Sequence, residues 1–440
     1  MGNGTVAETN VATCDRFIPV SKRDLLDALV ATPDMARAGT GDRFRLLCRL
    51  LGAAFHYEHF ERLERLRDDY YYFNPDLEVA HPFDPASLEK AHSELVAILT
   101  DALKEANFVE VPHADIARAH DDRQLLRVEV DAPMDDYREV VVFRRGHHMK
   151  TVETRQWFGL RKRAVETAIY DHVVLMVMVK PQADIKSAQQ RRRLAKNRLK
   201  PGTILIKYFR DIAFCDLRML FPEVRVVLSV FDKLLLGVPA LVGGIPIILN
   251  LYTSLSLLFV VVGFYLGVRG TLEADEIKTA LAALSGLAAL GGFIMRQWVK
   301  YQRQSLKYQK EITDNVYYRN VNNNAGIFDY IVGVAEEQEC KEVFLAYYFL
   351  HMAADRPTKE LLEQQIEAWL QATFGIEVKF TVSDVLEKLN RLGILQRDGD
   401  RLAVPDLLEA IDQLQRKWTD FFREGKSADS TNVNLPMRVA

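Results

Sequence analysis

Two stretches of this chain carry no charge, whereas charged and apolar positions alternate through the rest. Residues 234–268 and residues 279–295 contain no Asp, Glu, Lys or Arg. An uncharged apolar run of about 18 or more residues is typical of a membrane-spanning helix, because such a run is compatible with the hydrocarbon core of a bilayer. The pattern therefore predicts two membrane spans between large polar regions.

The first uncharged stretch is longer than one span requires. Its Gly and Pro residues are concentrated in residues 234–246, where they disfavour a continuous helix. We therefore predict a transmembrane hairpin at residues 233–298. It consists of a lead-in at 234–246, which is either re-entrant or interfacial, and of spans at 247–268 and 279–295.

The residues that flank the spans predict their orientation. Basic residues from Arg296 to Lys310 follow the second span, whereas the loop between the spans holds more acids than bases. The positive-inside rule then places both termini in the cytoplasm. The residues predicted at the membrane interface are Arg296, Trp298, Lys300 and Tyr301.

The region before the hairpin predicts a mixed domain. Apolar side chains keep helical spacing through residues 15–110, and short β-branched runs follow in residues 123–215. The Asp84-Pro85 pair is suited to begin a helix. We expect a disordered N-terminus at 1–14 and a cytoplasmic α+β domain at 15–232, in which helices accompany one small β-sheet.

The region after the hairpin predicts a helical linker at 299–337, a winged-helix-like domain at 338–425 and a disordered tail at 426–440. Three helical patterns precede a hairpin in which Asp398-Gly399 fits a type I′ turn. The third helical pattern holds as many acids as bases, which is a poor surface for phosphates. Nucleic acid is therefore disfavoured as a partner, and protein packing or dimerisation is favoured.

A basic segment interrupts the strand-like runs. It contains no acid, and its cations are Lys186, Arg191, Arg192, Arg193, Lys196, Arg198 and Lys200. A solvated loop or helix would explain such a segment. For a chain held at a membrane, we expect contact with anionic lipid headgroups instead. Single-stranded nucleic acid is less favoured, because no aromatic residues alternate with the charges.

No catalytic motif stands out in the 440 residues, and we predict neither a cofactor nor a metal. His56 and His59 lie three apart on a predicted helix, but His59 continues the apolar stripe, so a core histidine is favoured over a metal ligand. Asp211 and Asp216 are candidates for acid–base chemistry, although caps and surface turns explain them more simply. Four cysteines lie far apart, which indicates free thiols in a reducing compartment.

A polar run contains Asn322, Asn323 and Asn324 and is followed by Ala-Gly. Because Asn side chains hydrogen-bond to their own backbone in turns, a loop that ends a helix is the first interpretation. A contact with a ligand or another subunit is the alternative, so the three residues are a candidate interaction loop.

Several segments resemble the transmembrane protein 143-like family. They are FIPVSKRDLLDAL, HYEHFERLERLRDDYYYFNPD, LIKYFRDIAFCDLRMLFP, DKLLLGVPALVGGIPIILNL and the run from ALSGLAALGG to NNNAGIFDYIV. The resemblance implies a two-span protein of a bacterial or mitochondrial inner membrane, with uncharacterised biochemical function and no established catalytic residues. Because the N-terminus lacks the character of a presequence, we expect the bacterial inner membrane.

These observations predict a non-enzymatic inner-membrane protein that binds lipid or a protein partner through its cytoplasmic domains. The lipid bilayer and a second copy of the chain are the expected partners. The alternative function is a subunit of an oligomeric channel or transporter, although no ionisable residue lies within either span. A membrane-tethered enzyme that uses Asp211 and Asp216, or His56 and His59, ranks below both.

Overall fold

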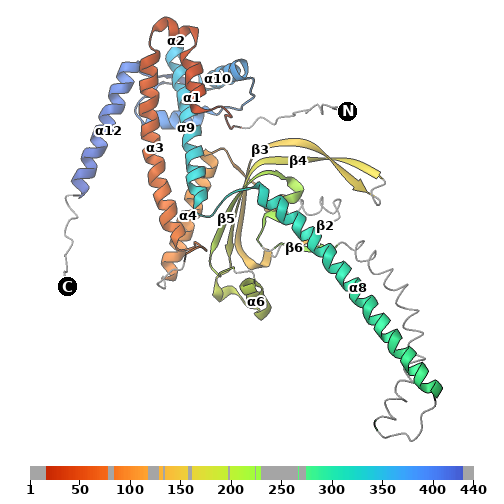
Figure 1. The fold of residues 1–440 in the computed structure, drawn as a ribbon. Coiled ribbons are helices and arrows are strands. Elements are labelled where there is room, and N and C mark those ends of the chain that lie inside the picture. The colour runs from red at the N-terminus through yellow and green to blue at the C-terminus, as the bar shows by residue number, and fades with distance from the viewer. Residues whose placement is uncertain are drawn as a thin grey trace, which may run out of the picture. The chain divides into compact units, whose positions relative to one another are not determined.

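The chain forms two compact units, which are described separately. Unit 1 comprises residues 1–112, 135–214 and 320–440, and unit 2 comprises residues 113–134 and 215–319. The computed structural model describes residues 16–77, 84–116, 128–131, 134–156, 161–196, 199–222, 224–228, 266 and 274–429. Figure 1 draws these residues as a coloured ribbon.

Unit 1 begins with four helices, and the first and fourth of them have a side-chain cap at the N-terminus. They are α1 (Lys22–Val30), α2 (Pro33–Ala38), α3 (Gly41–Tyr71) and α4 (Pro85–Glu105). The Ser21 hydroxyl accepts a hydrogen bond from the backbone N–H of Asp24, and the Asp84 carboxylate accepts one from that of Ser87. Such caps satisfy backbone donors that have no partner within the helix. The predicted helix start at Asp84-Pro85 is confirmed.

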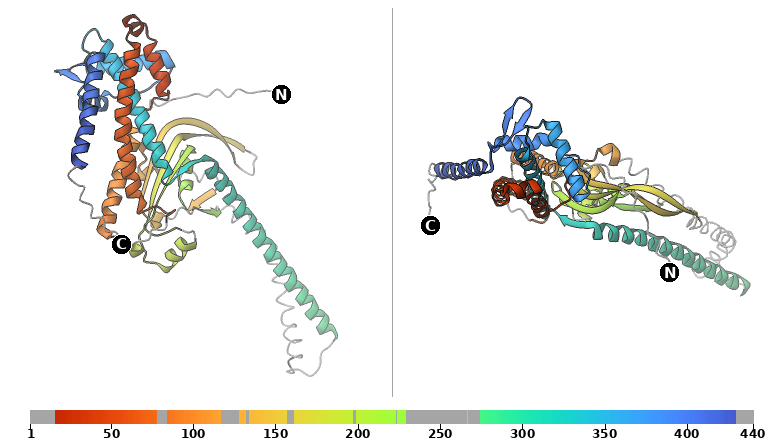
Figure 2. Two further views of the ribbon diagram at one scale, coloured as in Figure 1. Left: turned by 60° about the vertical axis from the view of Figure 1, so that its left-hand side comes forward. Right: turned by 90° about the horizontal axis from the view of Figure 1, so that it is seen from above.

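The sheet of unit 1 is antiparallel, with strand order β1-β3-β4-β5-β7. Its strands are β1 (Val109–Glu110), β3 (Tyr137–Gln156), β4 (Arg161–Val179), β5 (Ile204–Ala213) and β7 (Asn320–Asn323). β3 and β4 form a long curved hairpin (Figure 2). All residues from Val173 to Val179 are buried, so the central part of β4 is covered on both faces.

A second group of helices completes unit 1. It consists of α9 (Gly326–Met352), α10 (Lys359–Phe374), α11 (Val382–Arg391) and α12 (Leu407–Asp429), with the strands β8 (Gln396–Asp398) and β9 (Arg401–Ala403) between the last two helices. The predicted hairpin is confirmed. Its two-residue loop is Gly399-Asp400, one residue later than expected, and Gly399 has a φ of 60°, which glycine adopts readily.

Helix α9 takes part in both large apolar cores of unit 1. Its C-terminal half, including Phe344, packs in the first core with Phe44 of α3 and Leu389 of α11. Its N-terminal half, including Phe328, packs in the second core with Tyr70 of α3 and with the sheet. Residue 338, where the sequence predicts a separate C-terminal domain to begin, lies inside this continuous helix.

Unit 2 contains β2 (Val128–Asp131), β6 (Arg225–Leu228) and the 46-residue helix α8 (Ala274–Arg319). Among the residues that the structure describes, β2 pairs only with β6, in a two-stranded antiparallel sheet. The sequence predicts one sheet for all strand-like runs between residues 123 and 215, so the assignment of β2 to that sheet is wrong.

The predicted transmembrane hairpin is contradicted. Within the part of the chain that the structure describes, no helix combines the length and apolar character that a membrane crossing requires. Residues 234–246 and 247–268 lie outside the described residues, apart from Leu266. The fold class with a two-helix transmembrane hairpin, and the integral inner-membrane location that follows from it, are therefore wrong.

The second predicted span shows the physical reason for the correction. Residues 279–295 are helical, but α8 continues past them through a basic, polar sequence that begins at Arg296. At about 1.5 Å per residue, the uncharged part of α8 covers about 26 Å, less than the roughly 30 Å of a hydrocarbon core. The predicted interface residues Arg296, Trp298, Lys300 and Tyr301 all lie on α8, where the rings of Trp298 and Tyr301 stack at 6.3 Å between centroids.

The dependence of unit 1 on α9 leads to a prediction for Phe328→Ala. The Phe328 side chain is fully buried and meets the Tyr70 ring edge to face, with 5.1 Å between centroids. Removing it leaves a cavity, so we expect the free energy of unfolding of unit 1 to fall by about 3–5 kcal/mol. Urea denaturation followed by tyrosine and tryptophan fluorescence measures the change. Tyr71→Ala, at a position that is 49% exposed, is the control and should change stability much less.

Candidate functional site

A charged pocket of about 1100 Å³ opens in unit 1. Helices α3, α4, α9 and α11 supply most of its wall, together with the segments just before α1 and α11. The lining holds seven basic and five acidic side chains. The basic ones are Arg16, Arg62, Arg65, Lys104, Lys379, Lys388 and Arg391, and the acidic ones are Asp101, Glu105, Glu342, Asp384 and Glu387. Such a surface suits a charged ligand better than an apolar one.

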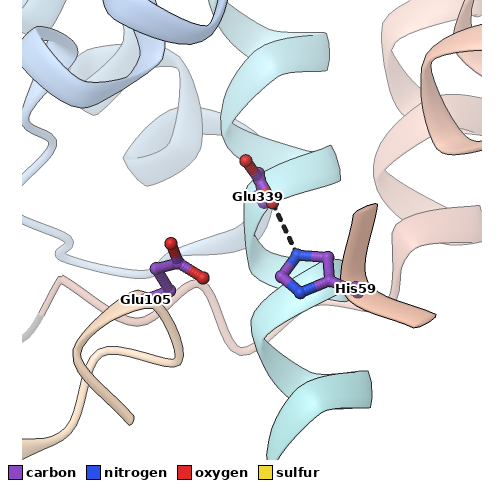
Figure 3. A group of neighbouring side chains, drawn as sticks. All are labelled: His59, Glu105 and Glu339. Atoms are coloured by element: carbon purple, nitrogen blue, oxygen red, sulfur yellow. Dashed lines mark hydrogen bonds and ion pairs between the residues drawn. The ribbon is translucent and has the colours of Figure 1, made fainter. Parts of the chain in front are cut away.

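A buried ion pair lies beside this pocket. The His59 Nε2 of α3 is 2.6 Å from the Glu339 Oε2 of α9, and the Lys388 Nζ of α11 is 3.2 Å from Glu339 Oε1. The side chains of His59 and Glu339 are 2% and 4% exposed (Figure 3). Burial alone would raise the pKa of Glu339, but the hydrogen bond with His59 and the charge of Lys388 lower it to about 2. Glu339 therefore stays ionised.

Glu342 lies one helical turn after Glu339, in an environment of opposite character. Its carboxylate lines the pocket, and its hydrogen-bond partner is the side-chain amide of Asn107, at 3.5 Å. No ion pair joins it to another described residue. Burial raises the pKa of Glu342 to about 7, against the weaker opposing effect of Lys388. The carboxyl groups of Glu339 and Glu342 therefore titrate far apart, which is a feature of sites that handle charge or protons.

Two further ion pairs join the helices around the pocket. The Arg62 guanidinium of α3 donates to the Glu105 carboxylate at the end of α4. The Arg391 Nη2 of α11 is 2.7 Å from the Glu58 Oε2 of α3. Burial raises the pKa of Glu58, although Arg391 counteracts this effect. Basic groups of the pocket wall are thus already close to carboxylates of the same protein.

Three side chains at this place have the geometry of metal ligands. One atom each of His59, Glu105 and Glu339 lies within 4.8 Å of the others. Figure 3 shows the Glu339 carboxylate of α9 against one nitrogen of the imidazole ring and the Glu105 carboxylate of α4 to one side of this pair. A nitrogen and two carboxylate oxygens form a donor set that Zn²⁺, Mn²⁺ and Fe²⁺ accept.

The structure separates the two histidines that the sequence brings together. His59 is buried, as predicted for a core histidine. His56 lies one turn earlier on α3, is 72% exposed, and pairs with Glu336 of α9 at 2.9 Å. The partners of His59 could not be found from sequence, because Glu339 is 280 residues away along the chain. The only local signal was the continuation of the apolar stripe through His59.

The predicted basic segment lies on and around α6 (Ala188–Lys196), away from the residues that line the pocket. Lys186, Arg191 and Arg192 are exposed, whereas Arg193 donates to the fully buried Asp136 and Lys200 donates to the Pro75 carbonyl. Arg198 and the side chain of Lys196 lie outside the described residues. Arg193 thus anchors α6 to the start of β3, and contact with anionic lipid stays a prediction.

The predicted interaction loop forms β7 and the turn before α9. The Asn322 side-chain amide donates to the Gly326 carbonyl at 2.7 Å, and that of Asn324 donates to Asp76 at 2.8 Å. The Asn323 Oδ1 accepts from Asn320 at 2.8 Å. Asn322 and Asn323 belong to the edge strand β7, which directly follows the end of α8, and Asn324 lies in the turn after it. A strand therefore takes the place of most of the predicted helix-ending loop.

The carboxylates proposed for acid–base chemistry have no part in the charged pocket. Asp211 is an exposed residue of β5 with a φ of 54°, and Asp216 lies in the 3₁₀ helix η4 (Phe214–Leu220). Neither belongs to the lining of the pocket or to the donor cluster.

Helix α11 would be the recognition helix if the C-terminal helices acted as a winged helix. Its residues Lys388 and Arg391 line the pocket and pair with Glu339 and Glu58. These cations therefore have intramolecular partners, which agrees with the expectation that nucleic acid is disfavoured without testing it.

Residues 137–326 match the model of a family described as protein of unknown function (DUF3754). No solved structure matches the chain. The matched residues include the long strands, α6, β6 and α8, but none of the residues that form the charged network around Glu339. The resemblance to the transmembrane protein 143-like family stays a prediction, and the charged pocket must be interpreted from its own chemistry.

The environment of Glu342 leads to a prediction for the pH dependence of stability. Its pKa rises from the ordinary 4.5 to about 7 on folding, so the folded protein keeps a proton that the unfolded chain has lost in this range. Wild-type stability should therefore fall as the pH rises from 4.5 to 7. Glu342→Gln cannot ionise, so we expect it to avoid up to about 3 kcal/mol of this loss.

Urea denaturation in steps from pH 5 to pH 8 measures the effect. Glu387→Gln is the matched control, because Glu387 lines the same pocket on α11 but is exposed, and its profile should run parallel to that of wild type. Parallel profiles for wild type and Glu342→Gln would show that the buried carboxyl does not have the raised pKa.

Proposed function

We propose that unit 1 binds a small organic anion in the charged pocket. The observation that carries this proposal is the excess of basic over acidic side chains in the lining, seven against five, beside a carboxyl group whose pKa lies near neutrality. Arg16, Lys104 and Lys379 are exposed and form no ion pair with another described residue, so they are available to a ligand. The proposal keeps the predicted binding function and replaces lipid or protein by a small molecule.

Stability alone does not account for the network around Glu339. Burying an ion pair removes two charges from water, and the desolvation cost cancels much of the attraction, so apolar residues of similar size often stabilise a fold equally well. The pairs of Glu339, Glu105 and Glu58 all adjoin one pocket. Perturbed carboxyl groups gathered at a cleft support a binding site.

The alternative function, a subunit of an oligomeric channel or transporter, depends on the two predicted membrane spans. Because the described part of the chain contains no helix suited to crossing a membrane, that alternative has no structural support.

Anion binding at this site should depend on pH in a definite direction. Below pH 7 Glu342 is protonated, and above pH 7 it adds a negative charge to the pocket. We therefore expect the affinity for an anion to fall as the pH rises from 6 to 8. In Glu342→Gln the affinity should stay nearly constant over this range, because the group cannot ionise.

Isothermal titration calorimetry of the full chain tests this prediction. The probes are tartrate, fumarate and inorganic sulfate, whose charges do not change between pH 6 and pH 8, at fixed ionic strength and with a chelator present. Replacing both Arg65 and Lys104, which line the pocket, by Ala should weaken binding by roughly 10-fold. The matched control replaces both Lys186 and Arg192, exposed cations of the basic segment, and should leave binding unchanged.

The control also separates the two basic surfaces of unit 1. If the Lys186 and Arg192 double variant loses the anion while the Arg65 and Lys104 double variant keeps it, binding occurs at the basic segment and the proposal is wrong. The same conclusion follows if none of the three probes binds to wild type at pH 6.

A further inference from the structure

The donor cluster of His59, Glu105 and Glu339 is built from three helices. α3, α4 and α9 each supply one residue, and the three donor atoms lie within 4.8 Å of one another. In a coordination sphere, ligand atoms that are each about 2.0–2.2 Å from a metal lie at most about 4.4 Å apart. To enclose one ion, the His59–Glu339 contact of 2.6 Å would lengthen, and any separation near the 4.8 Å limit would shorten.

His59 faces Glu339 through one ring nitrogen, and its other ring nitrogen has no partner in the described part of the chain. Its ring is held through Nε2 by Glu339 at 2.6 Å, while Nδ1 is buried without a hydrogen-bond partner among the described residues. A buried polar atom without a partner is uncommon in a folded protein. The nitrogen that faces the carboxylate is Nε2, so a metal ion between the two side chains would bind Nε2 and replace their hydrogen bond.

Two cationic side chains already lie against the same carboxylates. Arg62 contacts Glu105, and Lys388 contacts Glu339. Both Arg62 and Lys388 line the pocket, so each has space into which its charged end can turn. Positive charge is therefore required at this place, and a metal ion would supply it in a smaller volume than two long side chains do.

We propose that His59, Glu105 and Glu339 bind one divalent transition-metal ion in exchange for Arg62 and Lys388. This inference goes beyond the proposed function, because it concerns a different ligand. Once Arg62 and Lys388 have left the carboxylates, their charges are also available to a ligand in the pocket.

The test is calorimetry with Zn²⁺ and, separately, Mn²⁺, on the full chain without chelator and without organic anion. We expect one ion per chain in wild type. Glu105→Gln, at a residue whose side chain is 25% exposed, should keep the fold and weaken binding by roughly 100-fold. Arg62→Gln removes a competing cation, so it should bind the metal more tightly than wild type, by about 10-fold.

The chain offers a matched control one helical turn away. His56 and Glu336 form a contact between the same two helices at 2.9 Å, but they do not belong to the donor cluster. His56→Gln should leave metal binding unchanged, whereas His59→Gln should abolish it. Melting temperatures of the variants without metal show whether each one is folded.

Three results would overturn the proposal. The first is an equal loss of metal binding in His56→Gln and His59→Gln, which would indicate an adventitious surface ion. The second is tight metal binding that survives Glu105→Gln. The third is the absence of metal binding in both wild type and Arg62→Gln. Because the anion is titrated with a chelator and the metal without any anion, one proposal can fail while the other holds.

Discussion

The helical part of unit 1 depends on keeping one interior carboxylate paired. Glu339 is 4% exposed, and an uncompensated charge at such a place would cost several kcal/mol. His59 of α3 and Lys388 of α11 must therefore both reach Glu339 of α9. The apolar first core supplies the free energy that packs these helices together, but apolar contact alone tolerates small shifts in register. A buried charge does not tolerate such shifts, so the pairing of Glu339 fixes the positions of α3, α9 and α11 relative to one another.

The same requirement creates the difference between the carboxyl groups of Glu339 and Glu342. His59 and Lys388 both stabilise the ionised form of Glu339, whereas Glu342 has only the amide of Asn107 as hydrogen-bond partner. Burial then dominates at Glu342 and raises its pKa to about 7. A stretch of four residues thus places a fixed charge and an ionisable neutral group side by side at the pocket. This asymmetry follows from how many cations can reach each carboxylate.

Local signals predicted local structure well. The Asp84 cap, the β8–β9 hairpin and the burial of His59 depend on neighbours within a few residues, and each is confirmed. The site itself could not be predicted. Helical spacing shows which residues share a face, but it does not show which faces meet, and His59 and Glu339 are 280 residues apart.

The two larger errors have the same origin. Uncharged composition was taken to determine the environment of residues 279–295, although the helix that contains them continues through a basic sequence to Arg319. The strand-like run that ends at Asp131 was assigned to the main sheet, but its partner is β6, almost a hundred residues later. In both cases the composition of a short segment was used to predict its surroundings or its strand partner, and these depend on residues outside the segment.

The ion pairs of the pocket differ in how easily they can exchange partners. Arg62 and Glu105 are 32% and 25% exposed, so water can replace either partner, and such pairs contribute little to stability. Lys388 and Glu339 are 15% and 4% exposed, and breaking that pair without replacement would cost about 3–5 kcal/mol. Lys388 can therefore leave only when another cation arrives. This sets an order for any metal ion: it must first displace Arg62 at Glu105, and only its own charge, brought next to His59, can then release Lys388 from Glu339.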